Sequence, residues 1–187
     1  MKIYTKKGDA GQTSTLAANR LSKADARIRA LGGLDETNAA LGVVLAQPAL
    51  PEPLRPTLAR IQSLLFEAGA ALASRELGEA AALLAAETGW MEGEMDRLDS
   101  EITPLKRFIL PGGSSGGAAL HWARTVSRRA ETLVVAALAA ESGWEPLLAC
   151  LNRLSDLLFV LARWTNEQNG CPETIWRSRK EASEQGT

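Results

Sequence analysis

A row of leucines near the C-terminal end constrains the fold of this chain more than any other feature. The row recurs at steps of three and four, the spacing of one face of an α-helix, and consists of Leu147, Leu151, Leu154, Leu158 and Leu161. Phe159 adds an apolar side chain on the opposite side, so a helix over 145–169 is predicted to be apolar around much of its circumference. Such a helix needs neighbours on several sides, which places it at the centre of the fold.

Four earlier segments, 25–47, 54–75, 78–100 and 118–141, have helical periodicity, and strand signals are nearly absent. The sequence therefore predicts an all-α protein, a five-helix antiparallel bundle in a single domain spanning 1–187. We expect a loop over 1–22 that is ordered or forms a short strand with turns, the bundle over 23–170, and a polar tail over 171–187 that frays. The expected core stripe of the first helix is Ile28, Leu31, Asp35, Asn38, Gly42 and Leu45.

Composition excludes several classes of protein. With 21 basic and 22 acidic side chains, the chain has no broad charge for nucleic acid or an anionic membrane. It has neither an apolar run long enough for a membrane span nor a secretory signal, so we expect a soluble cytoplasmic protein with no membrane partner. Cys150 and Cys171 match no metal-ligand spacing, and two free thiols are favoured over one disulfide.

The N-terminal segment, residues 4–14, is rich in glycine, threonine, serine and lysine. Glycines allow a backbone to fold around an anion, hydroxyls donate to it, and Lys6 and Lys7 add positive charge. Asp9 could help to hold a Mg²⁺ ion that accompanies phosphates. The segment lacks a Walker motif, and a mobile terminus rich in turn residues is the alternative.

Four side chains lie along one face of the helix over 118–141, at steps of three and four: His121, Arg124, Arg128 and Glu131. An ordinary solvated face is the simplest interpretation. Leu120, Val135 and Leu138 share this side, however, and a half-apolar face bearing two arginines also suits a subunit interface or a ligand cleft.

Polar side chains beside apolar rows raise two further hypotheses. Asn152 and Asp156 lie one turn apart next to the leucines, where an amide could bind a ribose or a base, or simply bridge neighbouring helices. Asp35 on the core side of the first helix would need a cation, and Arg124 is the plausible partner in a buried ion pair.

Five segments together resemble one enzyme family: YTKKGDAGQTSTL, GGLDETNAALG, RFILPGG, LHWARTVSRRAE and LNRLSDLLFVLAR. In this order they resemble the PduO-type ATP:cob(I)alamin adenosyltransferases, with similarity running from Met1 to about Arg163. The resemblance implies transfer of the adenosyl group of ATP to cobalt, with ATP and corrinoid as substrates, Mg²⁺ with the ATP, and a reductase that supplies electrons. It also implies a homotrimer with sites between subunits.

The resemblance assigns residues to three roles. Arg124 matches an arginine that pairs with Asp35, possibly across the subunit boundary, and Phe108 matches the aromatic under the corrin ring. Arg128 and its neighbours match the second nucleotide segment. The implied nucleotide contacts are Thr5, Lys6, Lys7, Gly8, Thr13, Ser14, Lys23, Arg128, Arg129, Glu131, Thr132 and Asn152. The implied catalytic residues are Arg128, Phe108, Arg124 and Asp35. At Phe108 the alternative is a plug for the end of the bundle.

The implied chemistry agrees with the residues present. If Co(I) attacks the 5′ carbon of ATP, cobalt is the nucleophile, and no pair of side-chain nucleophile and base is needed. Lys6, Arg128, Mg²⁺ and Arg124 would neutralise the departing triphosphate. An ATP-binding sensor or scaffold without transferase activity is the alternative function, and a helical interaction module without a nucleotide site is a third.

Overall fold

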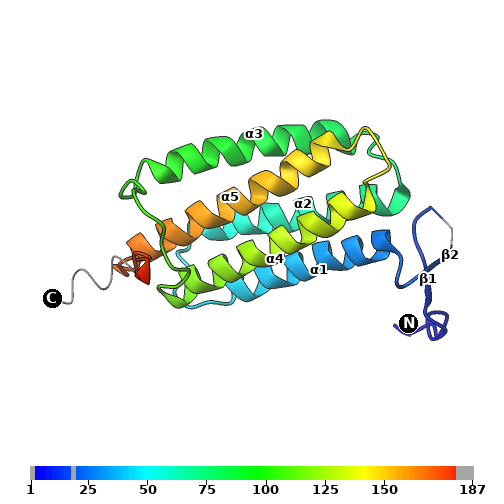
Figure 1. Ribbon diagram of the computed structural model, residues 1–187, viewed down its shortest axis with the longest axis horizontal. Coiled ribbons are helices and arrows are strands. Elements are labelled where there is room, and N and C mark those ends of the chain that lie inside the picture. Colours follow the sequence, from blue (N-terminus) through cyan, green and yellow to red (C-terminus); the bar gives the residue numbers. More distant parts are fainter. Residues whose placement is uncertain (1–2, 18–19, 180–187) are drawn as a thin grey trace.

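The computed structural model describes residues 3–17 and 20–179 and contains five helices. They are α1 (Ala26–Leu45), α2 (Leu54–Ser74), α3 (Ala80–Asp99), α4 (Ser115–Ala137) and α5 (Glu145–Gln168). Successive helices run in opposite directions along the long axis, and α5 lies between α3 and α4 (Figure 1). Leu147, Leu154, Leu158 and Leu161 are fully or almost fully buried. The five-helix architecture and the central position of α5 are confirmed.

Local chemistry sets the ends of the helices. The Asp25 carboxylate accepts a hydrogen bond from the Arg27 amide at 2.8 Å and caps α1. Ser114 caps α4 by accepting from the Gly117 amide at 3.1 Å, so α4 begins at Ser115 and not at 118. Gly116 and Gly117, which precede the predicted helix over 118–141, are thus part of α4. The structure uses Gly116 for close packing, because a Cβ atom there would lie 2.8 Å from the carbonyl oxygen of Ala49.

The core face of α1 differs from the expected stripe. Of the expected stripe only Asn38 is buried. The other buried residues of α1 are Arg27, Ala30, Gly33, Leu34, Thr37, Ala40, Leu41 and Val44. Gly33 gives α1 its close contact with α4, since a Cβ atom there would lie 3.1 Å from the Cα atom of Ala130. Asp35 is exposed, so its placement in the core stripe was wrong. Small residues let the two helices approach closely, and they do not stand out in a search for large apolar side chains.

Short extended segments flank the bundle. Strands β1 (Gln12–Ser14) and β2 (Arg20–Ser22) pair antiparallel in the N-terminal segment, in line with the expected strand and turns. In the tail, Ile175 forms a β-bridge with Ile109, and the Leu110 amide donates to the carbonyl of Thr174 at 2.8 Å. Residues 171–176 therefore lie against the bundle, contrary to the expected fraying. Residues 180–187 of the tail lie outside the described residues.

The two flanking regions lie at opposite ends of the long axis (Figure 1). The β1–β2 hairpin lies beyond the start of α1, whereas the segment between α3 and α4 meets the C-terminal tail at the other end. Cys150 is buried and Cys171 is partly buried, and both are free thiols as predicted. Over 3–17 and 20–179, no helix combines the length and apolar character that crossing a bilayer requires.

Candidate active site

The N-terminal segment folds into a cavity of about 350 Å³, which we call the cradle. Its lining residues are Thr5, Lys7, Gly8, Gln12, Thr13, Ser14, Arg20 and Lys23. Six predicted nucleotide contacts are thus brought together, namely Thr5, Lys7, Gly8, Thr13, Ser14 and Lys23. Lys6 belongs to the same turn without lining the cavity. Positive side chains and hydroxyl groups around one small cavity suit an anion.

Backbone turns give the cradle its shape. Lys6 has a φ of 61°, a left-handed conformation that is uncommon outside glycine, and Gly11 has a φ of 75°. The Gly11 amide donates to the carbonyl of Gly8 at 3.2 Å, and the Lys23 amide donates to that of Gly11 at 2.9 Å. The sequence reasoning missed Arg20, which faces Ser14 in the hairpin and donates to the Lys7 carbonyl at 2.9 Å. Pairing of β1 with β2 was the missing information.

A second cavity, of about 450 Å³, lies where α4 meets α5, and we call it the arginine pocket. Its lining residues are Arg128, Arg129, Glu131, Thr132, Val135 and Asn152. All the predicted nucleotide contacts on α4 and α5 line this pocket. The side-chain amide of Asn152 donates to Glu131 at 3.2 Å, so Asn152 bridges the two helices while lining the cavity. Arg129 forms an ion pair with Glu36 of α1.

His121 and Arg124 continue this face of α4, the first buried and the second partly buried. His121 is 3% exposed, and neither ring nitrogen has a hydrogen-bond partner among the described residues. Arg124 is partly buried beside Phe159, and its Nε atom likewise lacks a partner in the described part of the chain. Burial and then the charge of Arg128 lower the pKa of Arg124. The simple solvated-face interpretation is wrong at His121 and Arg124, since a buried polar atom without a partner is costly and the described residues supply no acceptor for the Arg124 Nε atom.

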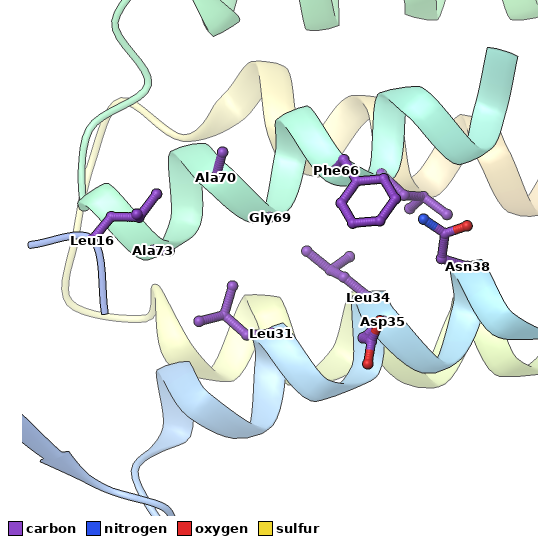
Figure 2. A pocket seen from close by; sticks show the side chains of 10 residues that line it. Leu16, Leu31, Leu34, Asp35, Asn38, Phe66, Gly69, Ala70 and Ala73 are labelled. Carbon is purple, nitrogen blue, oxygen red and sulfur yellow. The ribbon is translucent and has the colours of Figure 1, made fainter. Parts of the chain in front are cut away.

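Asp35 lines two cavities on the side of α1 that faces away from α4. One, of about 580 Å³, also includes Thr13 and Ser14. The other, of about 320 Å³, is an apolar groove in which Leu34 of α1 lies opposite Phe66 of α2 and Leu31 lies opposite Ala73 (Figure 2).

The expected buried ion pair between Asp35 and Arg124 does not form within the described chain. Gly33 faces α4, and two residues further along, about 200° around the helix, Asp35 points away from α4. The expected core-side position of Asp35 on α1 was therefore wrong, and a pair with Arg124 across a subunit boundary stays a prediction.

Phe108 lies on the segment between α3 and α4 and is 80% exposed. Exposure on this scale contradicts a plug for the end of the bundle. The ring meets Trp176 edge-on, with centroids 6.4 Å apart and planes at 86°. With Leu105, Lys106 and Arg107 it borders a shallow cavity of about 290 Å³.

Asn166 of α5 holds the segment that follows Phe108. Its side-chain oxygen accepts from the amide of Ser114 at 2.9 Å and from the Ser114 hydroxyl at 3.1 Å. Its side-chain nitrogen donates to the carbonyl of Gly112 at 2.9 Å. Glycine is required beside this amide, since a Cβ atom at Gly117 would lie 2.0 Å from its oxygen.

Comparison with known proteins decides the family. The sequence model of the cobalamin adenosyltransferase family matches residues 3–165. The chain belongs to this family. It is 40% identical over 181 residues to a cobalamin adenosyltransferase of Cupriavidus metallidurans, covering 97% of each chain. It is 41% identical over 174 residues to a corrinoid adenosyltransferase of Bacillus subtilis, covering 91% of this chain and 89% of the relative.

Solved structures agree with the sequence relatives. A variant PduO-type ATP:corrinoid adenosyltransferase from Lactobacillus reuteri, complexed with cobalamin and ATP, superposes with a TM-score of 0.83 at 35% identity. The match covers 95% of this chain and 100% of that chain. This cobalamin adenosyltransferase therefore carries its two anion-suited surfaces, the cradle and the arginine pocket, on a fold shared with a protein solved with ATP and cobalamin.

Proposed function

We propose that this ATP:corrinoid adenosyltransferase builds each active site between two copies of the chain. The protein transfers the 5′-deoxyadenosyl group of ATP to the cobalt of a reduced corrinoid and releases triphosphate. One observation carries the inter-subunit arrangement: the cradle and Asp35 open on one side of α1, whereas Arg124 and the arginine pocket lie on α4 away from it. The cradle and the arginine pocket share no lining residue.

Unsatisfied charges support this arrangement. Arg124 has a buried Nε atom without an acceptor in the described chain, and Asp35 has an exposed carboxylate beside the cavity of Thr13 and Ser14. A second copy can supply each with the other, which satisfies a charge that would be costly to leave buried alone. Such a contact joins two different surfaces of the same chain, and it forms a closed ring when the rotation between successive copies closes. The proposed ring is a homotrimer, as the family resemblance implies.

The length of the bundle supports the same conclusion. The cradle lies at one end, and Phe108 belongs to the segment at the other end (Figure 1). A helix of 20 residues such as α1 is about 30 Å long. An ATP molecule held in the cradle would have to extend along this length to reach a corrinoid beside Phe108 of the same copy. A neighbouring copy can bring the two regions together.

In the proposed site, the cradle residues, which include Thr5, Lys7 and Gly8, hold the triphosphate from one copy, and Lys6 of the same turn adds a further positive charge. Arg128 and Arg129 approach the triphosphate from the other copy and stabilise the negative charge that develops on it as it leaves. Glu131, Thr132 and Asn152 line the same pocket as these arginines and would fix the nucleoside. A bound Mg²⁺ needs only one or two carboxylates besides the phosphates, and the exposed Asp9 beside the cradle fits that need.

Phe108 completes the proposal on the corrinoid side. An exposed aromatic ring suits the apolar underside of a corrin, where it would exclude water and the lower axial ligand. Loss of that ligand makes Co(II) easier to reduce, so axial ligation is the lever on the redox potential. Electrons would come from a separate reductase. We also expect the whole chain, 1–187, to act as one domain in the cytoplasm.

Mixing two inactive variants tests the inter-subunit site. Lys6→Ala damages the cradle, and Arg128→Ala damages the arginine pocket. If each site takes one surface from each of two copies, a co-expressed equal mixture contains about one intact site in four. We expect about that share of wild-type activity from the mixture, and far less from either variant alone. A mixture no more active than the separate variants would refute the inter-subunit site.

A further inference from the structure

The last described segment of the chain lies directly against Phe108. We call Glu173–Trp176 the strap. Ile175 forms a β-bridge with Ile109, the Leu110 amide donates to the carbonyl of Thr174 at 2.8 Å, and the Trp176 amide donates to the carbonyl of Phe108 at 2.8 Å. The strap therefore holds both the backbone of Phe108 and that of its neighbours.

An ion pair ties the strap to the bundle. Arg163 of α5 has a side chain that is 4% exposed, and its Nε atom donates to the Glu173 carboxylate at 2.8 Å. The same guanidinium donates to the carbonyl of Thr103 at 2.6 Å and lies 3.4 Å from Asp99. One buried arginine thus joins the strap to the start of the Phe108 segment. Because burial leaves few other partners, Glu173 is closely tied to its position.

The aromatic contact completes the arrangement. Phe108 is 80% exposed, so the body of the bundle does little to fix its ring. Trp176 lies edge-on to that ring at 6.4 Å, a preferred geometry for aromatic pairs. The indole favours one orientation of an otherwise exposed side chain.

We infer that the strap is a positioning element for Phe108, with Trp176 and Glu173 as positioning residues for the corrinoid reaction. The inference rests on the proposed role of Phe108 in excluding the lower axial ligand. Neither residue needs to touch ATP or cobalt. Each acts by keeping the phenyl ring in the orientation that shields the underside of the corrin, so the ring begins the reaction already ordered.

Such a role differs measurably from a purely structural one. Reaction that starts from Co(II) corrinoid depends on loss of the axial ligand, whereas reaction from chemically prepared Co(I) corrinoid does not. Damage to the strap should therefore slow the Co(II) route selectively. General damage to the end of the bundle would slow both routes alike.

The experiment measures both rates for the full-length protein with MgATP and corrinoid. Trp176→Ala should slow the Co(II) route about three- to tenfold, the change that an edge-to-face ring pair can support. The Co(I) route should stay within about twofold. Trp176→Phe should recover most of the loss because it restores a ring edge. Trp90→Ala is the matched control. The guanidinium carbon of Arg60 in α2 lies 3.9 Å from the centroid of the Trp90 ring, so this indole also has a packing partner.

Glu173→Gln tests the ion pair, and Glu92→Gln is its control, because Glu92 pairs with Arg153 on the exposed surface at 3.0 Å. The fraction of bound Co(II) corrinoid without an axial ligand, measured by electron paramagnetic resonance, should fall in Trp176→Ala and Glu173→Gln and stay unchanged in both controls. Thermal unfolding of each variant checks that the bundle remains folded. If Glu173→Gln unfolds, Trp176→Ala decides alone.

Phe108→Ala separates the two levels of the argument. If it slows both routes equally, the axial role of Phe108 is wrong, and the role of the strap is lost with it. If Phe108→Ala slows the Co(II) route selectively while Trp176→Ala matches wild type or slows both routes equally, only the strap inference is overturned. Selective loss in both variants, with recovery in Trp176→Phe, supports it.

Discussion

Replacing Asn166 by alanine should loosen the Phe108 segment by a predictable amount. Asn166 is only 2% exposed, and its side chain makes three hydrogen bonds, two with Ser114 and one with Gly112. At about 1 kcal/mol each, with a small cavity added beside Gly117, their loss should lower the free energy of unfolding by about 3–4 kcal/mol. For a chain of this length that corresponds to a fall in Tm of about 6–15 °C.

Thermal unfolding followed by circular dichroism, at one fixed protein concentration, measures this loss. Asn169→Ala is the control, because this exposed asparagine also donates to two carbonyl oxygens, of Ala49 and Thr165. We expect the control to lose less than about 1 kcal/mol. Gly117→Ala approaches the same contact from the other side and should also destabilise, since its methyl group would overlap the Asn166 oxygen. Equal Tm values for Asn166→Ala and Asn169→Ala would refute the reasoning.

Three further predictions concern single side chains. Arg128→Ala should reduce turnover at least about tenfold with little change in Tm, because the lost interaction acts on triphosphate charge; wild-type rates would remove Arg128 from the site. Burial and then the charge of Arg124 lower the pKa of His121, so stability should be full above the unfolded-state pKa near 6.5 and fall as the pH drops below it. A pH series of Tm values should show this loss, and His121→Asn should reduce it. Burial raises the pKa of the Cys150 thiol to about 12, so a thiol reagent at pH 7.5 should label Cys171 alone in the native protein and both cysteines after unfolding.

Periodicity predicted the helices well because large apolar side chains dominate their buried faces. The leucines of α5 located the central helix, and the boundaries of α2 and α5 agree with the expected ranges to within a residue or so. The same reasoning failed on α1. There Gly33 makes the close contact with α4, and a search for larger side chains selected a stripe that includes Asp35, which is exposed.

The candidate site shows the same division. Contacts supplied by one helix or one loop could be predicted, and Arg128 and Thr132 line one cavity as expected. Local patterns did not predict contacts between distant segments, and the family resemblance alone grouped Asn152 of α5 with the residues of α4. Arg20 joins the cradle through hairpin pairing, and Trp176 reaches Phe108 through a single β-bridge next to it. No local pattern in the sequence specifies either pairing.

The near-contact of Gly33 with Ala130 has a consequence for the arginines of α4. One side of α4 packs against Gly33, which has no side chain, and Arg124 and Arg128 project from another side of α4. A shift of one residue in the register of α4 would rotate the helix by about 100°. The rotation would press a larger side chain than Ala130 against Gly33. The smallest residues in the bundle thus fix the rotational setting of its largest cations. Enlarging Gly33 should redirect the guanidinium groups without altering any residue of the proposed site.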